Sequence, residues 1–280
     1  MPDFSESDVD FFDLTVPEPN LPLLVEIPHA GLWVPDAVRD QLDAPSDALR
    51  RDADIYVDEL YEHAPQWGAA RLAAKVSRYV VDLNRAADDV DAVAVADHPA
   101  PAYTQPRGVV WRATTDGRPV LKKPLTYSAL LERLAAFYTP YHDALQSTLD
   151  ALLARHGYVI LLAAHSMPSR GRSLHRDVGA KRADIVPGTQ GRTTAHPAVI
   201  DAVDAHFREA GLRVVHDDPY MGGYTTQHYG QPEQGVHAIQ VEINRALYVN
   251  EDTYEQIPDR FAALQKVLDG LVLRLGNLRF

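Results

Sequence analysis

Three apolar runs along the chain have the length and composition of strands that are buried on both faces of a parallel sheet. The first covers residues 23–27 and leads into His29, the second covers 158–164 and leads into His165, and the third covers 236–243. Such continuous apolar runs are typical of strands that helices cover on both sides. In an open α/β sheet, ligands bind beyond the carboxyl ends of the strands. The pattern therefore predicts that the two histidines lie in one crevice.

Other segments alternate between helical and short extended patterns. Apolar residues recur every three to four positions, as in amphipathic helices, over residues 47–64, 127–155 (with a kink at Pro140), about 196–210 and about 253–275. Short strands are expected at 79–83 and 212–215, and long loops at 97–124, 166–194 and 217–235. Strands that alternate with helices indicate an α/β fold with a mostly parallel sheet and helices on both faces. No shift in composition divides the chain, so we expect one domain over 1–280, in which residues 1–20 could be flexible.

Composition narrows the classes of partner and of metal site. The chain has 280 residues and a formal net charge of −12, which argues against general binding to nucleic acid or to anionic membranes. There is no cysteine, so a metal would need His, Asp or Glu ligands, as catalytic zinc does. The acidic N-terminus has no apolar stretch that could act as a signal peptide, and no run approaches the length of a membrane span. We expect a soluble cytoplasmic protein.

Two imidazoles delivered by separate strands could share one metal ion. A single loop histidine is more often a solvated or hydrogen-bonded residue, but the shared placement of His29 and His165 favours ligation for both. A third ligand is sought among the acids of the expected 47–64 helix. Asp54 and Asp58 are four residues apart and would share a helix face, while Asp52 is the other candidate. A solvated acidic face is the alternative interpretation, and spacing alone does not choose among the three.

Glu242 is an acid inside an apolar strand. Strict alternation directs its side chain opposite to those of Val241 and Ile243. A buried carboxylate is costly unless it is paired or functional, and burial would raise its pKa toward the range of a general base. An ion pair with Arg245 or another arginine is the structural alternative.

Several polar residues near the expected strand ends could bind an anion. Arg85 follows the 79–83 strand, and a guanidinium there can hold a carboxylate through two parallel hydrogen bonds, unless it pairs with a nearby aspartate. Arg170 and Arg172 follow His165 closely and could do the same, although loop arginines are usually solvated. The glycine-rich loop at 222–230 offers hydroxyl and imidazole donors that would suit a loop enclosing a substrate.

Seven motifs, in order, resemble the N-formylglutamate amidohydrolase family. They are LLVEIPHAG at 23–31, DADIYVDELY at 52–61, SRYVVDLNR at 77–85, ILLAAHSMPS at 160–169, ADIVPGT at 183–189, GGYTTQHYG at 222–230 and HAIQVEINRALY at 237–248. The resemblance implies a central mixed sheet between helices, as in zinc carboxypeptidases and aspartoacylases. It also implies hydrolysis of an N-acyl amino acid, typically N-formyl-L-glutamate to glutamate and formate, which is a step of histidine degradation in the bacteria that it resembles.

The resemblance also assigns roles to residues. His29 and His165 match the two histidine ligands, and Glu242 matches the presumed general base. Leu32 occupies the position where carboxypeptidase relatives have their glutamate ligand, so that spacing cannot supply the carboxylate here. The resemblance instead favours Asp54 as the third ligand, because it is the aspartate of the 52–61 motif that related sequences share most widely. The pair Asn84-Arg85 resembles the pair that aspartoacylases use to bind the substrate carboxylate, and the remaining candidates for substrate contact are Arg170, Arg172, Thr226, His228 and Arg245.

Two stretches depart from the family pattern. Gln227 stands where arginine is common, and residues 171–181 are richer in arginine than usual. Both changes lie in loops expected to contact substrate, so they leave the identity of the acyl amino acid open.

The resulting hypothesis is a Zn²⁺-dependent amidohydrolase, with another divalent metal as an alternative, that acts on a small anionic N-acyl amino acid. An aspartoacylase-like deacylase or a zinc carboxypeptidase is the second hypothesis, and a non-catalytic binding protein of the same fold is the third. The sequence does not decide between a monomer and a homo-oligomer.

Overall fold

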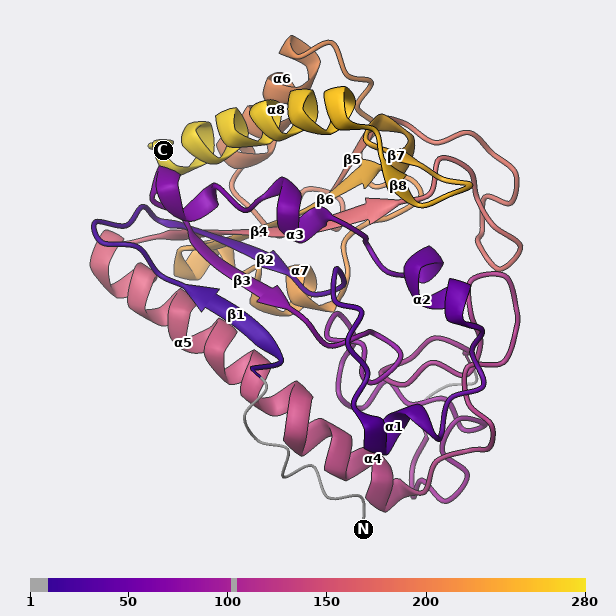
Figure 1. The fold of residues 1–280 in the computed structure, drawn as a ribbon. Helices are drawn as coiled ribbons and strands as arrows, with labels where there is room; N and C mark the ends of the chain where they lie inside the picture. The colour runs from indigo at the N-terminus through magenta and orange to yellow at the C-terminus, as the bar shows by residue number, and fades with distance from the viewer. Residues whose placement is uncertain (1–9, 102–104) are drawn as a thin grey trace.

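A central sheet of six strands organises the structure, a computed structural model that describes residues 10–101 and 105–280 (Figure 1). Its strands are β1 (Phe12–Thr15), β2 (Leu23–Ile27), β3 (Ala70–Ala74), β4 (Val159–Met167), β5 (Ile185–Gly188) and β6 (Val236–Asn244). Across the sheet the order is β1-β3-β2-β4-β6-β5. The inner four strands are parallel, whereas β1 and β5 pair antiparallel at the two edges. The prediction of a mostly parallel, mixed sheet is confirmed.

Helices cover both faces of this sheet. The helical elements are α1 (Asp36–Arg39), α2 (Ser46–Asp52), α3 (Val57–Leu60), the 3-10 turn η1 (Ala64–Trp67), α4 (Tyr127–Arg133), the π-turn η2 (Leu134–Tyr138), α5 (Thr139–His156), α6 (Pro197–Glu209), α7 (Tyr224–Tyr229), the 3-10 turns η3 (Pro232–Gln234) and η4 (Arg245–Leu247), and α8 (Pro258–Gly276). A small hairpin pairs β7 (Val249–Asn250) with β8 (Glu255–Gln256). None of the helices in the described ranges is both long and apolar enough to cross a membrane.

The alternation of side chains along the strands separates two apolar cores. In β2, Val25 and Ile27 pack with residues of α3, α6 and α8, whereas Leu24 packs with residues of α4, α5 and α7 on the opposite face. Figure 1 shows α5 along one side of the sheet and α6 with α8 along the other. Both faces are therefore buried, which explains why β2 and β4 have continuous apolar runs.

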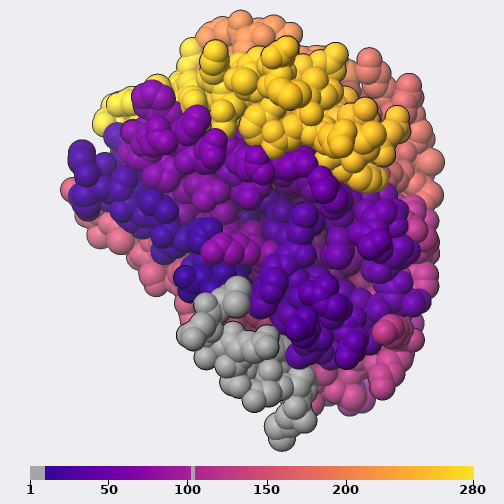
Figure 2. Space-filling model, viewed as in Figure 1, coloured from indigo at the N-terminus to yellow at the C-terminus, as the bar shows by residue number. Residues whose placement is uncertain are grey.

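Segments from the two ends of the chain lie side by side on the surface. In Figure 2 the C-terminal region (yellow) lies directly against the N-terminal third of the chain (violet). The side-chain amide of Gln265, on α8, donates to the carbonyl oxygen of Glu59, on α3, at 2.9 Å. The C-terminal helix thus supports the segment that follows α2.

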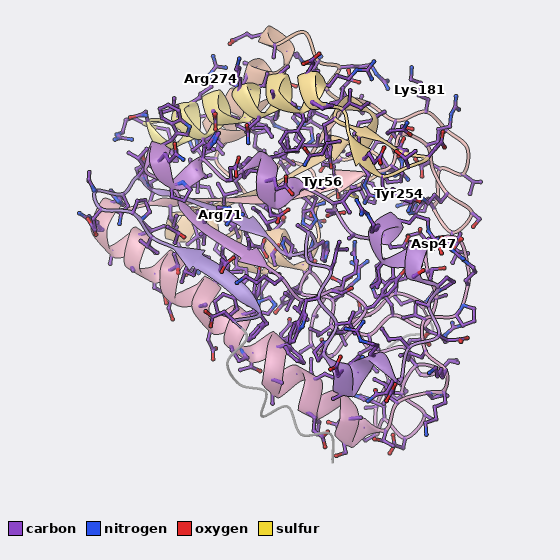
Figure 3. All side chains as sticks on the ribbon, viewed as in Figure 1. Asp47, Tyr56, Arg71, Lys181, Tyr254 and Arg274 are labelled. Atoms are coloured by element: carbon purple, nitrogen blue, oxygen red, sulfur yellow. The ribbon has the colours of Figure 1, made fainter. Side chains whose placement is uncertain are left out.

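The expected helix over 47–64 is wrong, because it is interrupted after Asp52. Helix α2 ends there, and Tyr56 adopts a left-handed conformation (φ 64°) before α3 begins. The Tyr56 hydroxyl donates to the carbonyl oxygen of Tyr254 at 3.1 Å, and the two residues lie close together in Figure 3. Asp54 and Asp58 consequently do not share a helix face.

Other elements differ from the sequence expectations at their ends or in kind. Residues 79–83 form turns and irregular chain rather than a strand, and residues 212–215 contribute only an isolated bridge between Val214 and Ile185. Strands β1, β3 and β5 were not expected, and the last helix begins at Pro258 rather than near 253. The predicted helix over about 196–210 is confirmed as α6, and the 127–155 pattern is divided by η2, just before Pro140.

Glu26 is a carboxyl group buried in the middle of the sheet. It lies on β2 and faces the α5 side, where the Tyr141 hydroxyl donates to its Oε1 at 3.3 Å. Its Oε2 has no hydrogen-bond partner among the described residues. Burial raises the pKa of Glu26 to about 7, although the charge of the nearby His165 and the hydroxyl groups of Thr225 and Tyr141 oppose the shift.

Glu26→Gln should stabilise the protein above neutral pH and change its stability little near pH 5. A carboxyl whose pKa is raised on folding contributes stability below its unfolded pKa and loses it as pH rises to the folded value. With a pKa of about 7 against 4.5 for the exposed group, the gain at pH 8 should be about 3 kcal/mol. Urea unfolding of the wild type and the variant at pH 5 and at pH 8 measures the difference in the free energy of unfolding. Glu233→Gln, at an exposed position, is the control. An equal effect of Glu26→Gln at pH 5 and pH 8 would contradict the raised pKa.

Candidate metal centre and active-site cavity

His29, Asp54 and His165 come together in one buried cluster. One ligand atom from each lies within 4.8 Å of the others. The Asp54 Oδ2 atom is 2.9 Å from His165 Nδ1 and 3.6 Å from His29 Nδ1. The two imidazole centroids are 4.9 Å apart. The same ring nitrogen of each histidine therefore faces one carboxylate oxygen.

The sheet and the interrupted helix place these three side chains. His29 follows β2, and His165 lies inside β4, two residues before its end, because this strand is longer than its apolar run suggested. Strands β2 and β4 are adjacent and parallel, so both histidines reach the same edge of the sheet. Asp54 lies in the break between α2 and α3, where its backbone N–H donates to the carbonyl oxygen of His29 at 2.9 Å.

Neighbouring charged groups fix the orientation of the cluster. Arg245 Nη2 donates to Asp54 Oδ1 at 3.1 Å, which leaves Oδ2 to face the imidazoles. His29 Nε2 is 2.7 Å from Asp82 Oδ1, and the other Asp82 oxygen accepts from Arg78 and from the indole N–H of Trp111, each at 2.8 Å. A carboxylate behind a histidine is the arrangement that orients metal-binding imidazoles in proteins.

Both buried aspartates remain ionised. Burial opposes ionisation of Asp54, but hydrogen bonds from His165 and His29 outweigh it and hold the pKa of this carboxyl far below its ordinary value. Burial likewise opposes ionisation of Asp82, and the charge of Arg78 with that of His29 keeps its pKa low. Two imidazole nitrogens and an ionised carboxylate form a donor set that suits zinc with an open coordination position. The residues present fit a divalent metal.

Glu242 faces this cluster from the adjacent strand. Strands β4 and β6 pair in parallel register with His165 opposite Glu242, so the two side chains lie on the same face of the sheet. Gln240 Nε2 donates to Glu242 Oε1 at 2.9 Å. No arginine forms an ion pair with Glu242 in the part of the chain that the structure describes. Arg245, the expected partner, pairs with Asp54 instead. Burial raises the pKa of Glu242, and the charge of Asp54 raises it further against the lowering effect of His165.

A cavity of about 410 Å³ opens beside these residues. Its wall contains the three cluster residues together with Glu242, and it is rich in arginine. The arginines that line it are Arg78, Arg85, Arg107, Arg172, Arg176, Arg182 and Arg245. An acidic protein thus concentrates positive charge around one buried cluster, which favours a small anionic ligand.

Comparison with known proteins identifies the family of this chain. The family model for N-formylglutamate amidohydrolase matches residues 21–249. The chain belongs to the N-formylglutamate amidohydrolase family.

Three relatives of known name extend over most of the chain. This chain is 36% identical over 235 residues to an N-formylglutamate deformylase of Pseudomonas aeruginosa and 34% identical to one of Pseudomonas putida. Each match covers 82% of this chain and 83% of the relative. The crystal structure of N-formylglutamate amidohydrolase from Ralstonia eutropha is 32% identical, with a TM-score of 0.87 and coverage of 96% of this chain and 98% of that one.

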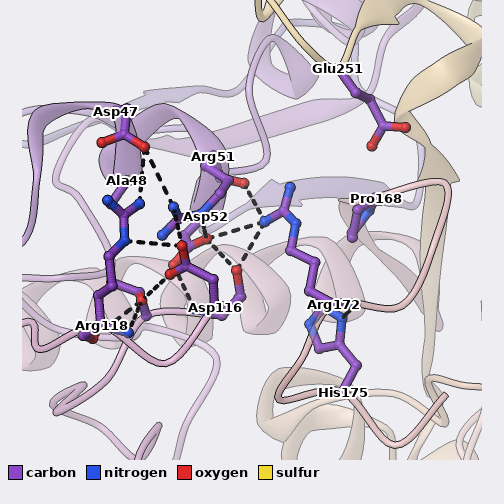
Figure 4. A network of polar contacts seen from close by, with 12 residues as sticks. Asp47, Ala48, Arg51, Asp52, Asp116, Arg118, Pro168, Arg172, His175 and Glu251 are labelled. Carbon is purple, nitrogen blue, oxygen red and sulfur yellow. Dashed lines mark hydrogen bonds and ion pairs between the residues drawn. The ribbon is translucent and has the colours of Figure 1, made fainter. Parts of the chain in front are cut away.

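The structure distinguishes the three acids, Asp52, Asp54 and Asp58, that the sequence offered as a third metal ligand. Asp52 is buried and lines the cavity but is not part of the cluster: its carboxylate accepts hydrogen bonds from Tyr79 and Thr115 and pairs with Arg172 (Figure 4). Asp58 lies on α3 and does not line the cavity. Asp54 alone of the three lies beside both histidines.

Four of the expected substrate-binding residues line the cavity, namely Asn84, Arg85, Arg172 and Arg245. Three others do not. Arg170 is exposed and donates to the carbonyl oxygen of Gly179, the ring of His228 is stacked on that of Tyr224 at 4.8 Å, and Thr226 is buried within α7. These three residues therefore lie outside the cavity wall, and their contact with substrate stays a prediction.

Sequence reasoning did not single out several other residues of the cavity wall. Gln240 lies two residues before Glu242 on β6 and therefore on the same face, which is a signal that strand alternation could have provided. Arg78 lies within the matched motif at 77–85. Arg107 and Tyr220 lie in irregular segments that no periodic pattern places.

Asp54→Asn should weaken zinc binding by about two orders of magnitude or more, because the substitution removes the only carboxylate of the donor set. Asp58→Asn is the matched control and should bind zinc as the wild type does. Competition with a chelator at fixed pH measures both affinities, and circular dichroism verifies the fold of each variant. Normal zinc affinity in Asp54→Asn would show that this carboxylate is not a ligand.

Proposed function

We propose that this protein hydrolyses N-formyl-L-glutamate to L-glutamate and formate with a divalent metal, zinc, held by His29, Asp54 and His165. The observation that supports this most directly is the buried His-Asp-His cluster facing Glu242 in an arginine-lined cavity. The names of the relatives, N-formylglutamate deformylase and N-formylglutamate amidohydrolase, point to the same reaction.

The metal would supply Lewis-acid chemistry when bound, since such an ion polarises a carbonyl group and makes water more acidic. The protein residues perform the proton transfers. Glu242 accepts the proton of the water that attacks the formyl carbon and then delivers it to the departing amine nitrogen, which becomes the amino group of glutamate. The raised pKa of Glu242 suits this exchange, because the carboxyl must both take and return a proton.

Positive charge in the cavity wall binds the substrate, which has two carboxylates. Arg85 is half-buried and fixed by a 2.9 Å hydrogen bond from its Nε to the carbonyl oxygen of Arg107, so its terminal nitrogens remain available. The preceding residue, Asn84, contacts His165 Nε2 through its side-chain nitrogen at 3.2 Å. This placement supports the assignment of Arg85 to the α-carboxylate of a substrate whose formyl group lies at the His29-Asp54-His165 cluster.

Release of formate decides between this proposal and its alternatives. Purified zinc-loaded protein should release formate from N-formyl-L-glutamate much faster than acetate from N-acetyl-L-aspartate or an amino acid from a dipeptide. Preference for the acetyl substrate would favour a deacylase, preference for the peptide would favour a carboxypeptidase, and no product from any of them would favour a binding protein.

Glu242→Gln should retain zinc and lower kcat by about a hundredfold or more, because an amide cannot accept the proton of water. Metal analysis and steady-state kinetics on the same preparation measure both quantities. Near-normal kcat in the zinc-containing variant would exclude Glu242 as the base.

Arg85→Ala should raise KM for N-formyl-L-glutamate by about tenfold or more with a smaller effect on kcat, because it removes a charged contact to the bound substrate. Arg170→Ala, whose guanidinium lies outside the cavity wall, is the comparison variant. Equal KM values for the two variants would rule out the assignment of Arg85.

A further inference from the structure

Arg107 is a cavity-wall residue to which neither the family resemblance nor the metal cluster assigns a role. It lies in the irregular chain between β3 and α4 and is half-buried. Its Nη2 donates to the carbonyl oxygen of Leu174 at 2.9 Å, and its guanidinium lies 5.8 Å from the ring centre of Trp111. Its own carbonyl oxygen accepts from Arg85 Nε. The side chain is thus held in place beside Arg85 without using all its donors.

Arg107 differs from most arginines of the cavity in having no acidic partner. Four of them form ion pairs with nearby aspartates: Arg78 with Asp82 at 2.8 Å, Arg172 with Asp52 at 3.1 Å, Arg182 with Asp177 at 2.8 Å and Arg245 with Asp54 at 3.1 Å. Arg85 has a longer contact, 3.9 Å, with Asp89. No acid of the described residues lies within 4.0 Å of the Arg107 guanidinium, and the same holds for Arg176, which is exposed.

The largest charge effects on Arg107 come from other cations, and Tyr220 and Asp52 offset them only in part. Arg78 stacks on the same Trp111 ring, with its guanidinium carbon 4.3 Å from the ring centre. Burial lowers the pKa of Arg107, and the charges of Arg78 and Arg85 lower it further. A partly desolvated cation beside like charges is stabilised when an anion binds to it. The structure therefore offers a second anion-binding position next to Arg85.

We propose that Arg107 binds the side-chain carboxylate of N-formyl-L-glutamate while Arg85 binds the α-carboxylate. This inference rests on the proposed function. In the substrate the side-chain carboxylate is two bonds farther from the formyl carbon than the α-carboxylate is. Arg85 follows Asn84, which contacts His165, whereas the Arg107 guanidinium is anchored to Leu174 in the loop after β4. Arg107 thus determines specificity for an acidic side chain.

Three substrates with one charge changed at a time test this assignment. N-formyl-L-glutamine lacks the side-chain charge, and N-formyl-L-isoglutamine lacks the α-carboxylate charge. Arg107→Met should lower kcat/KM by about 30-fold or more for N-formyl-L-glutamate and N-formyl-L-isoglutamine, and by less than about threefold for N-formyl-L-glutamine. Arg107→Lys keeps the positive charge but cannot form two parallel hydrogen bonds to a carboxylate. It should lower kcat/KM for the same two substrates, by a smaller factor than Arg107→Met does.

Arg274→Met is the matched control, because it removes one positive charge on α8, which Figure 3 places at the outer surface of the molecule. It should leave all three kcat/KM values unchanged. Equal losses on all three substrates in Arg107→Met and Arg107→Lys, or losses confined to the two substrates that retain the α-carboxylate, would overturn the assignment. Absence of formate release by the wild type would instead overturn the proposed function on which it rests.

Discussion

The ionised carboxylate of Asp54, buried between two imidazoles, is the constraint on which the site depends. Its side chain is only 4% exposed, and an unpaired charge at such a position would be strongly destabilising. His29, His165 and Arg245 compensate it from three other parts of the chain. The break after α2, the end of β2 and the end of β4 must therefore all be in place for the carboxylate to be accommodated. The same requirement brings together a donor set for a divalent cation.

The parallel register of β4 and β6 places Glu242, the proposed general base, beside His165. Because His165 and Glu242 are direct neighbours across the two strands, the carboxyl group of Glu242 lies beside the His29-Asp54-His165 cluster without being part of it. The two acids differ in environment: Asp54 is held ionised by imidazoles, while burial and the nearby negative charge raise the pKa of Glu242. Such a separation of pKa values is what the proposed roles of Asp54 as a ligand and Glu242 as a general base require. The sheet therefore sets the position of Glu242, and its burial beside Asp54 sets the direction of its pKa shift.

The sequence predicted the parts of the site that lie on strands, and it left open those that lie on irregular chain. Strand periodicity placed His29, His165 and Glu242 at one edge of the sheet, since buried apolar runs are a strong local signal. Asp54 could not be distinguished from its neighbours, because the helical pattern over 47–64 hides a break that depends on a left-handed Tyr56 and on contacts with the distant C-terminal region. The strands β3 and β5 were missed because β3 is short and interrupted by an arginine, and β5 lies at the sheet edge and contains a proline. Arg107 has no periodic signal at all, and only the folded chain brings it to Arg85.

Anomalous X-ray scattering at the zinc edge, from crystals of the zinc-loaded protein, tests the central claim most directly. We predict one strong anomalous peak in the cavity, within about 2.0–2.2 Å of Nδ1 of His29, Nδ1 of His165 and Oδ2 of Asp54, which are the usual distances for these ligands. A peak bonded to other residues, or no peak between these three side chains in crystals of protein that releases formate, would contradict it.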